Sequence, residues 1–341
     1  MKILVTGATG FIGSAFVQAL IAKKTNYDIY CAVRPSSNIE DFKNLDINFV
    51  NFDLTDFSSF RPAVEGKDIV IHFASRYKNW DRTPEDVLFS RNVEATQKLA
   101  EACLSAKVQH FIYCSTTEAL GKVVDGTEES VYNPDEVYGE TKMEAEKILL
   151  DMQEKRYLPL TIARPTGVTG YGDCYPFLDI ILAVDKKLIL LPRFLPGSGK
   201  GTIHWTDIQD IVQGFIKIIE MPDKSIGQIY ILASDRAQTW NDVIKAICNN
   251  LGITSSTYHI PVFLARLGVP LFLLYYKVRK VKNFILYPNA VKKLQTSRSY
   301  INTKAKTDLG FNPSIDFESS VKDSVSWLKE RGLLKNGQKK Y

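Results

Sequence analysis

The sequence has few of the residues that crosslink a chain or bind metals. It contains 5 cysteines and 4 histidines in 341 residues. The cysteines form no C-x-x-C pair and leave one unpaired, which argues against both a disulfide framework and a zinc site. The histidines show no metal-ligand spacing. We therefore expect no metal centre, and a reducing, cytoplasmic compartment.

Long apolar runs and a strong charge imbalance are also missing. No run of about 18 uninterrupted apolar residues is present that would span a bilayer. The start of the sequence, MKILVTGATG, lacks the basic region and cleavage site of a signal peptide. The formal net charge is only +5, with basic residues interspersed among acids, which disfavours a nucleic-acid partner. The composition is that of an ordinary globular protein.

The first half of the sequence alternates strand and helix patterns. Short β-branched runs (KILVTG, DIYCAV, INFVNF, DIVIHFA and HFIYCST) are separated by helical patterns around 11–23, 83–105 and 136–154. This alternation predicts an α/β fold with a Rossmann-type, doubly wound parallel sheet that binds ligands at the carboxyl ends of its strands.

The sequence also suggests a division into two domains. We predict a dinucleotide-binding domain over 1–164, to which 207–233 returns with the strand pattern QIYILA. Residues 165–206 and 234–341 are predicted to form a smaller, mixed α/β domain on the substrate side of a cleft.

A glycine-rich turn links the first strand pattern to the first helix pattern, with the spacing G-x-x-G-x-x-G. Glycine lets the chain turn tightly and lets a pyrophosphate approach the backbone, while the helix start offers unpaired N–H groups. The predicted dinucleotide-binding residues of this turn are Gly7, Thr9, Gly10, Phe11, Ile12 and Gly13.

The ends of the next two strand patterns bear on which dinucleotide binds. The second ends at Arg34, without the acid that would bind a ribose 2′-hydroxyl. Arginine there suits a 2′-phosphate, so NADP(H) is favoured and NAD(H) is possible; a solvated surface arginine is the simpler alternative. After the third strand, Asp53, followed by Leu54, is placed to meet the adenine amino group or to cap a loop.

Tyr138 and Lys142 lie four residues apart at the start of a helical pattern, so their side chains share one face. A free tyrosine has a pKa of about 10, and a neighbouring ammonium favours its ionised form. The preceding strand ends in hydroxyls, Ser115-Thr116-Thr117, at the same predicted edge of the sheet. Together these residues predict an acid/base site.

In this order, the motifs resemble those of the extended short-chain dehydrogenases/reductases, the NAD-dependent epimerase/dehydratase family. The resemblance covers nearly the whole chain. It rests on the glycine turn at 7–13, Asp53-Leu54, His72-Phe73-Ala74-Ser75, Asn92-Val93-Glu94-Ala95-Thr96, 115–121, Tyr138 with Lys142, and Arg164-Pro165. Ala32-Val33-Arg34-Pro35, the aromatic and basic segment 76–80, and Leu309-Gly310-Phe311 resemble its dihydroflavonol-reductase-like and 3β-hydroxysteroid-dehydrogenase-like branch.

The resemblance implies roles for the catalytic residues. It makes Tyr138 the acid/base, Lys142 the residue that lowers the tyrosine pKa and binds the nicotinamide ribose, and Thr116 the hydroxyl that orients the substrate oxygen. Leu120 departs from the family, which often has tyrosine there, and this tilts the prediction away from sugar substrates.

The resemblance also implies further cofactor contacts. Ala74 and Ser75 would border the pyrophosphate and ribose, and Pro165 to Val168 would lie beside the nicotinamide carboxamide. Asn92 resembles a structural and proton-relay asparagine, although an asparagine early in a helix can equally be a local cap.

Residues 262–282 combine the most apolar stretch of the sequence with a following cluster of cations. Arg266 and Pro270 interrupt it, so it is predicted either to cover the substrate pocket or to lie on a membrane surface. We favour the first, because apolar stripes usually belong to a core. Either suits a lipophilic, sterol-like or isoprenoid-like substrate.

The sequence therefore predicts an NAD(P)(H)-dependent oxidoreductase that interconverts a secondary alcohol and a ketone of a small molecule. One alternative is a nucleotide-sugar epimerase or 4-ketoreductase, in which Arg193 and Lys200 would bind a diphosphate. Another is a non-catalytic cofactor-binding protein. A homodimer is the default expectation for the oligomeric state.

Overall fold

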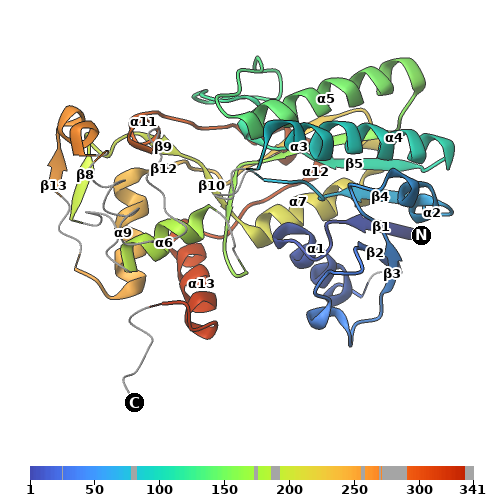
Figure 1. The fold of residues 1–341 in the computed structure, drawn as a ribbon, viewed down its shortest axis with the longest axis horizontal. Helices are drawn as coiled ribbons and strands as arrows, with labels where there is room; N and C mark the ends of the chain where they lie inside the picture. Colours follow the sequence, from blue (N-terminus) through green and yellow to red (C-terminus); the bar gives the residue numbers. More distant parts are fainter. Residues whose placement is uncertain are drawn as a thin grey trace.

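A seven-stranded parallel sheet forms the larger part of the molecule (Figure 1). The computed structural model describes residues 1–24, 26–77, 83–172, 176–185, 193–254, 258–268, 270 and 290–334. The strand order is β11-β6-β5-β4-β1-β2-β3, and every neighbouring pair is parallel. The strands are β1 Lys2–Thr6, β2 Asp28–Val33, β3 Asn48–Asn51, β4 Ile69–His72, β5 His110–Cys114, β6 Leu160–Pro165 and β11 Ile229–Leu232. The predicted Rossmann-type sheet is confirmed, and its order reverses between β1 and β4, where such sheets bind ligands.

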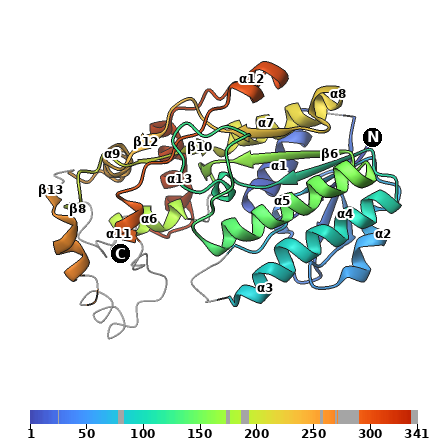
Figure 2. The same ribbon diagram turned by 90° about the horizontal axis from the view of Figure 1, so that it is seen from above.

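Helices cover both faces of the sheet because successive strand residues point to opposite sides. In β1, Ile3 and Val5 pack in one core with Phe16, whereas Leu4 packs in the other with Leu99. Figure 2 shows α1 and α7 on one face and α2, α4 and α5 on the other. These helices are α1 Phe11–Ala22, α7 Ile208–Glu220, α2 Phe60–Val64, α4 Ala95–Ser105 and α5 Val137–Arg156. The predicted helix at 83–105 consists of α3 Glu85–Phe89, a π-helical turn over Ser90–Glu94, and α4.

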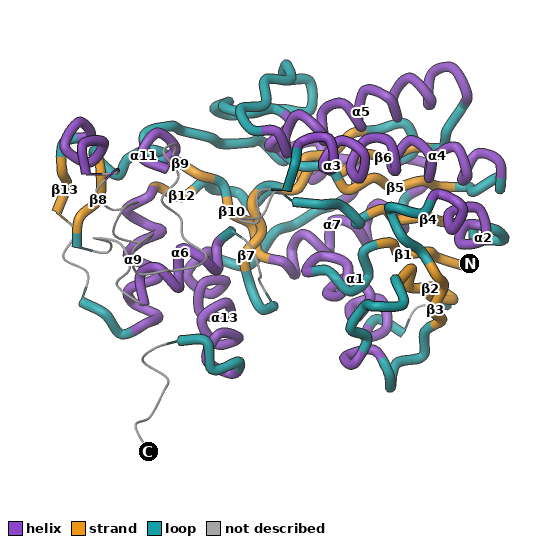
Figure 3. Tube along the Cα trace, in the orientation of Figure 1, coloured by secondary structure: helices purple, strands orange, loops and turns teal. Residues whose placement is uncertain are grey.

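A smaller region lies beyond the carboxyl ends of the strands. Figure 3 shows the helices α6, α9 and α13 there, beside short strand pairs. The helices pack around a third core that includes Phe177, Trp205, Val243 and Val325. The elements are α6 Phe177–Asp185, α9 Trp240–Leu251, α13 Phe317–Glu330, β7 Gly167–Thr169 with β10 Trp205–Asp207, β9 Thr202–Ile203 with β12 Gln238–Thr239, and β8 Phe194–Pro196 with β13 Tyr258–Ile260.

One late segment belongs to the sheet rather than to the smaller region. The helix α12 (Thr303–Leu309) lies within the predicted smaller domain, 234–341. Yet Ala305, Leu309 and Phe311 are buried in the core formed by α1, α7 and the sheet. Further short elements include α8 Pro222–Ser225, α11 Ala290–Lys293, the helical residues 262–268, and the 3-10 turns Glu40–Phe42, Phe57–Ser59 and Thr117–Ala119.

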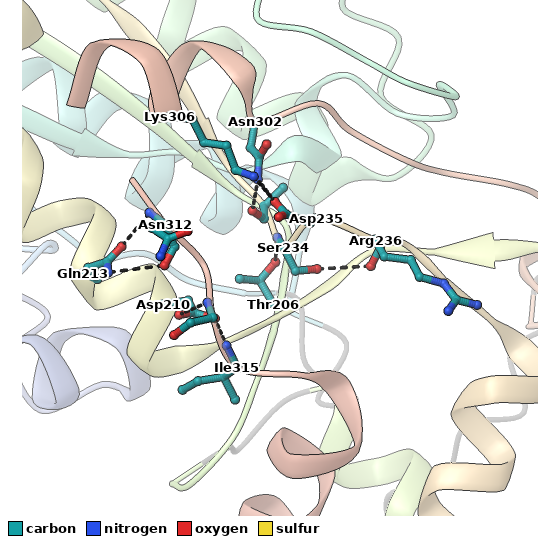
Figure 4. Close-up of polar contacts among 12 residues, drawn as sticks. Thr206, Asp210, Gln213, Ser234, Asp235, Arg236, Asn302, Lys306, Asn312 and Ile315 are labelled. Carbon is teal, nitrogen blue, oxygen red and sulfur yellow. Dashed lines mark hydrogen bonds and ion pairs between the residues drawn. The ribbon is translucent and has the colours of Figure 1, made fainter. Parts of the chain in front are cut away.

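Polar contacts join the end of β11 to α12 (Figure 4). Asn302 Nδ2 donates to Asp235 Oδ1 over 2.8 Å, and Lys306 forms an ion pair with the same carboxylate at 2.6 Å. The Ser234 N–H donates to Thr206 Oγ1 over 2.7 Å, which ties this turn to β10. These contacts fix the chain where it leaves β11, the last strand of the sheet in sequence order.

Within the described ranges, no helix is both long and apolar enough to cross a membrane. The same residues contain no cluster of three or more histidine, cysteine or acidic side chains that would hold a metal ion.

Candidate active site

The predicted site residues come together because all seven strands run the same way. β1 begins at the far side of the sheet from the smaller region, so the carboxyl ends of the strands face that region (Figure 1). The glycine turn follows β1, Arg34 follows β2 and Asp53 follows β3. Ala74 follows β4, Thr116 follows β5, and Pro165 ends β6. The fold therefore places these residues along one edge.

The glycine turn is shaped by close backbone packing. Gly7 has φ +68°, and a Cβ there would lie 2.7 Å from the backbone nitrogen of Ala74. A Cβ on Gly13 would lie 2.2 Å from the carbonyl oxygen of Gly7. Side chains are excluded at both positions, so the loops after β1 and β4 touch and the first turn of α1 closes on the strand.

The start of α1 fits a pyrophosphate. Gly10 is its N-cap residue and provides no side-chain hydrogen bond to the first N–H groups of the helix. Thr9 and Gly10 are exposed, while Phe11 and Ile12 are half-buried against the core of this layer. A helix start with uncapped N–H groups at an exposed glycine is a favourable place for an anion.

Arg34 and Asp53 lie within electrostatic reach of each other. Arg34 is exposed, as both the 2′-phosphate hypothesis and the surface alternative require. Asp53 Oδ1 accepts from the backbone N–H and the hydroxyl of Thr55, over 2.9 and 2.8 Å. Burial raises the pKa of Asp53, but these hydrogen bonds and the charges of Arg34 and Arg91 outweigh it and leave that pKa lowered. Asp53 caps its loop, and Leu54 beside it is half-buried.

A directional hydrogen-bond chain connects β1 to the helix before α4. Thr96 donates its hydroxyl hydrogen to the Asn92 carbonyl over 2.7 Å, so it must accept from His72 Nε2, 3.1 Å away. His72 Nδ1 is then an acceptor for the Thr6 hydroxyl at 2.7 Å, and Thr6 in turn accepts the Ala74 N–H over 3.3 Å. Burial lowers the pKa of His72 to about 3, so the ring stays neutral and this chain keeps one direction.

Asn92 supports the segment after β4. Its Oδ1 accepts the Arg76 N–H over 2.7 Å, and its Nδ2 donates to the Arg76 carbonyl over 2.8 Å. Nδ2 also donates to Thr141 Oγ1 over 3.1 Å, between the predicted acid/base residues of α5. The π-helical turn brings this buried amide to both partners, which is a common use of such turns. Both amide hydrogens are engaged, which supports the structural role, while the proton relay stays a prediction.

Tyr138 and Lys142 occupy the first turns of α5. Lys142 is only 2% exposed, and its Nζ donates to the Cys114 carbonyl over 2.9 Å. Nζ lies 4.7 Å from the ring centroid of Tyr113 and 5.9 Å from that of Tyr138. Burial lowers the pKa of Lys142 to about 8, opposed by Cys114 and by Glu146.

The Tyr138 phenol is held in its protonated form. Burial raises its pKa, Glu118 and Cys114 raise it further, and a hydrogen bond with Ser75 acts the other way. The sequence predicts that Lys142 favours the ionised form, but here burial dominates. A protonated phenol is the form that donates a proton to a developing alkoxide.

Thr116 and the residues after β6 complete the predicted set. Thr116 Oγ1 accepts the Glu118 N–H over 3.2 Å, a hydrogen bond that leaves the hydroxyl's own hydrogen unused. Pro165 pairs with Leu232 of β11, and Val168 lies in β7, half-buried against the core. The joint action of Thr116 and Tyr138 on one substrate oxygen stays a prediction.

The structure adds two residues that sequence reasoning missed. The Tyr77 ring packs edge-on against Tyr138, with centroids 4.7 Å apart. Glu118 has a buried Oε2 with no hydrogen-bond partner among the described residues, and burial raises its pKa, with smaller contributions from neighbouring charges. Gly139 brings Glu118 close, since a Cβ there would lie 2.6 Å from the Glu118 carbonyl oxygen. The sequence offered one signal for Glu118, which is its place directly after the hydroxyls Ser115-Thr116-Thr117 that follow β5.

Some predicted features give no support to the site. Leu120 is buried in a small core with Ile231 and Tyr300, and the tilt away from sugar substrates stays a prediction. Arg193 and Lys200 are exposed. Of 262–282, residue 269 and residues 271–282 lie outside the described part of the chain.

Comparison with known proteins provides an independent view of this site. A model of the NAD dependent epimerase/dehydratase family matches residues 3–233. Sterol-4-alpha-carboxylate 3-dehydrogenase, decarboxylating, from Mus musculus is 27% identical over 340 residues, covering 95% of this chain and 90% of that protein. dTDP-D-glucose 4,6-dehydratase from Dictyostelium discoideum is 30% identical over 369 residues, covering 96% of this chain and 81% of that protein.

Two further comparisons bear on length and fold. The 3beta-hydroxysteroid-dehydrogenase/decarboxylase isoform 2 of Arabidopsis thaliana is 23% identical over 354 residues, and this chain spans 61% of its length. The crystal structure of UDP-glucuronic acid 4-epimerase from Bacillus cereus in complex with NAD superposes with a TM-score of 0.75 at 22% identity, covering 97% of this chain and 99% of that one. At this identity the likeness establishes the fold.

Proposed function

Because this chain belongs to the NAD-dependent epimerase/dehydratase family, of the extended short-chain dehydrogenase/reductase type, we propose that it moves hydride between a nicotinamide cofactor and a secondary alcohol or ketone. The proposed reacting groups are Tyr138, Lys142 and Thr116. The observation that carries the proposal is the pairing of a protonated phenol with a buried ammonium on the first turns of α5. Both lie at the sheet edge that also holds the uncapped glycine turn.

The residues of this chain have distinct tasks in that reaction. The nicotinamide supplies or accepts the hydride when it is bound. In the reducing direction Tyr138 donates its phenolic proton to the carbonyl oxygen, and Thr116 donates a hydrogen bond to that oxygen. Lys142 stabilises the resulting phenolate by its positive charge. In the oxidising direction the same groups accept the proton.

Substituting the phenol tests this assignment. Tyr138→Phe retains the ring that packs on Tyr77 but removes the proton, so hydride exchange should fall by about 10² to 10⁴-fold while NADH binding persists. Turnover is followed by nicotinamide absorbance with a panel of secondary alcohols and ketones. Tyr157→Phe, at the end of the same helix and 86% exposed, is the matched control. Equal turnover by Tyr138→Phe and the parent would reject the role of the phenol.

For the cofactor, we propose NADP(H) over NAD(H). The support is the exposed guanidinium of Arg34 after β2, with no acid at the tip of that strand. The family and a structural neighbour solved with NAD support a nicotinamide dinucleotide in general.

For the substrate, we propose a lipophilic alcohol or ketone of the sterol or isoprenoid class. Two named relatives act on sterols or steroids. In addition, residues 262–268 are helical, with Phe263 62% exposed and Leu267 70% exposed. An apolar helix face of this kind suits contact with an apolar ligand or with a lipid surface.

Flotation with anionic vesicles, comparing the parent with a Phe263→Ser and Leu267→Ser double variant, tests the lipid contact. A parent that stays with the unbound fraction rejects it.

The second candidate function is chemistry on a nucleotide sugar. It is favoured by the 30%-identical dTDP-D-glucose 4,6-dehydratase. Glu118 also gives the site a second protonatable group near Tyr138. NAD(H) that stays bound throughout purification, together with turnover of a nucleotide sugar, would establish this candidate in place of the first.

A further inference from the structure

Behind Lys142 lies a buried charged cluster that the proposed reaction does not use. Its central residue is Glu146, whose side chain is fully buried and paired with the 1%-exposed Arg164. Arg164 Nη2 lies 2.6 Å from Glu146 Oε2, and its Nε lies 3.1 Å from both carboxylate oxygens. The Tyr132 hydroxyl donates to Glu146 Oε2 over 2.6 Å, and Ser115 donates to Oε1. The carboxylate is therefore surrounded by donors, one of which is the Arg164 guanidinium.

Glu146, the central residue of this cluster, lies on α5, the same helix as Tyr138 and Lys142. Lys142 and Glu146 are one turn apart on α5, and they hold consecutive residues at the end of β5. Lys142 donates to the Cys114 carbonyl over 2.9 Å, and Ser115 donates to Glu146. The end of β5, which leads into Thr116, is thus fastened to α5 at two points by the ammonium and the carboxylate.

The groups around Lys142 indicate that Glu146 is the anion that stabilises its ammonium. The titratable groups facing it are Tyr113 and Cys114 of β5, His72 of β4, Tyr138 and Glu146 of α5, with Arg164 of β6 behind Glu146. Burial lowers the pKa of His72 to about 3 and raises that of the Cys114 thiol to about 11, so both are neutral near pH 7. Both tyrosines are likewise protonated, because burial raises their pKa values. Among the groups of the described residues that act on Lys142, Glu146 is the one that remains as a negative charge.

We propose that Glu146 is a positioning residue that acts through Lys142, holding the lysine ammonium in its charged form and fixing the end of β5 beneath the substrate oxygen. This inference rests on the proposed function for its catalytic meaning. Even with Cys114 and Glu146 opposing it, burial brings the pKa of Lys142 down to about 8, so the ammonium is close to losing its proton at physiological pH. Removal of the Glu146 carboxylate would lower the pKa of Lys142 further, and the lysine would then be neutral near physiological pH.

The test is the pH dependence of NADH binding, measured by nicotinamide fluorescence between about pH 6 and pH 9.5. A neutral Lys142 binds the ribose less well, so affinity should fall on the alkaline side, with a midpoint that Lys142→Met removes. In Glu146→Gln this midpoint should move about one unit toward acid, because losing a nearby opposite charge shifts a pKa by about that amount. A second variant, Glu146→Gln with Arg164→Met, avoids leaving the arginine buried and unpaired. Glu144→Gln, on the exposed face of the same helix, should leave the midpoint unchanged.

The outcomes separate this inference from the proposed function. An acid shift in either folded Glu146 variant supports it, even if no alcohol or ketone is turned over, in which case the proposed function fails alone. An unmoved midpoint overturns it, and so does a parent without an alkaline limb. Loss of folding in both variants also overturns it, because Glu146 is then needed only for stability.

Discussion

Replacing Gly7 by alanine tests whether backbone contact between two loops shapes the dinucleotide site. Gly7 has φ +68°, where an alanine is strained by about 1 to 2 kcal/mol. The added Cβ would lie 2.7 Å from the Ala74 nitrogen and 2.9 Å from the Phe73 carbonyl carbon. These are backbone atoms that no rotamer change can move, so the clash adds about 1 to 3 kcal/mol. Alanine returns about 0.4 to 1 kcal/mol by restricting the unfolded chain, which leaves a net loss of about 3 kcal/mol.

Gly66 supplies the matched control for this substitution. Its φ is +64°, and a Cβ there would meet nothing within 4 Å. Gly66→Ala therefore carries the strain without the clash and should lose about 1 kcal/mol or less. Urea unfolding of the two variants and the parent gives the difference, and NADH fluorescence should show weakened binding only for Gly7→Ala. If Gly7→Ala were as stable as Gly66→Ala, the inferred close contact between the loops after β1 and β4 would be wrong.

Three further predictions concern other parts of the site and the core. Arg34→Ala should weaken NADPH binding about ten-fold or more and leave NADH binding nearly unchanged, because only NADPH carries the 2′-phosphate; equal losses for both cofactors would contradict this. Asn92→Ala should lower the free energy of unfolding by about 1 to 3 kcal/mol, since it strands backbone groups after β4, and urea unfolding measures this. Burial lowers the pKa of His72 to about 3 and of His110 and His204 to about 4. The stability that these neutral histidines provide is therefore fully present above about pH 6.5. Below that pH the free energy of unfolding should fall by about 1.4 kcal/mol per histidine and pH unit. Urea unfolding between neutral pH and about pH 5 measures this fall, which should be less steep in His110→Asn.

The parts of the site that follow from the sequence are those fixed by local geometry. The glycine spacing at 7–13 and the separation of Tyr138 and Lys142 are set by one turn and one helix, and a parallel sheet brings strand ends to one edge without further information. The strand and helix patterns of the first half led to the observed sheet for the same reason, since each face of each strand is buried in a regular alternation.

The parts that the sequence did not reveal depend on contacts between distant segments. Tyr77 meets Tyr138 across 61 positions of the chain, and nothing in its neighbourhood signals that contact. The apolar positions of α12 predict a buried face but not which core receives it. The protonation state of Tyr138 depends on burial, which a four-residue spacing does not contain.

The segment after β4 connects the dinucleotide turn to the acid/base helix. The Gly7 backbone packs on it, and the Thr6 hydroxyl accepts the Ala74 N–H. From the other side, Asn92 binds both backbone groups of Arg76 and the hydroxyl of a residue between Tyr138 and Lys142. Displacement of this segment from either side would release many of the same contacts. The losses in stability from Gly7→Ala and Asn92→Ala should therefore be less than additive in the double variant, whereas independent supports would give a simple sum.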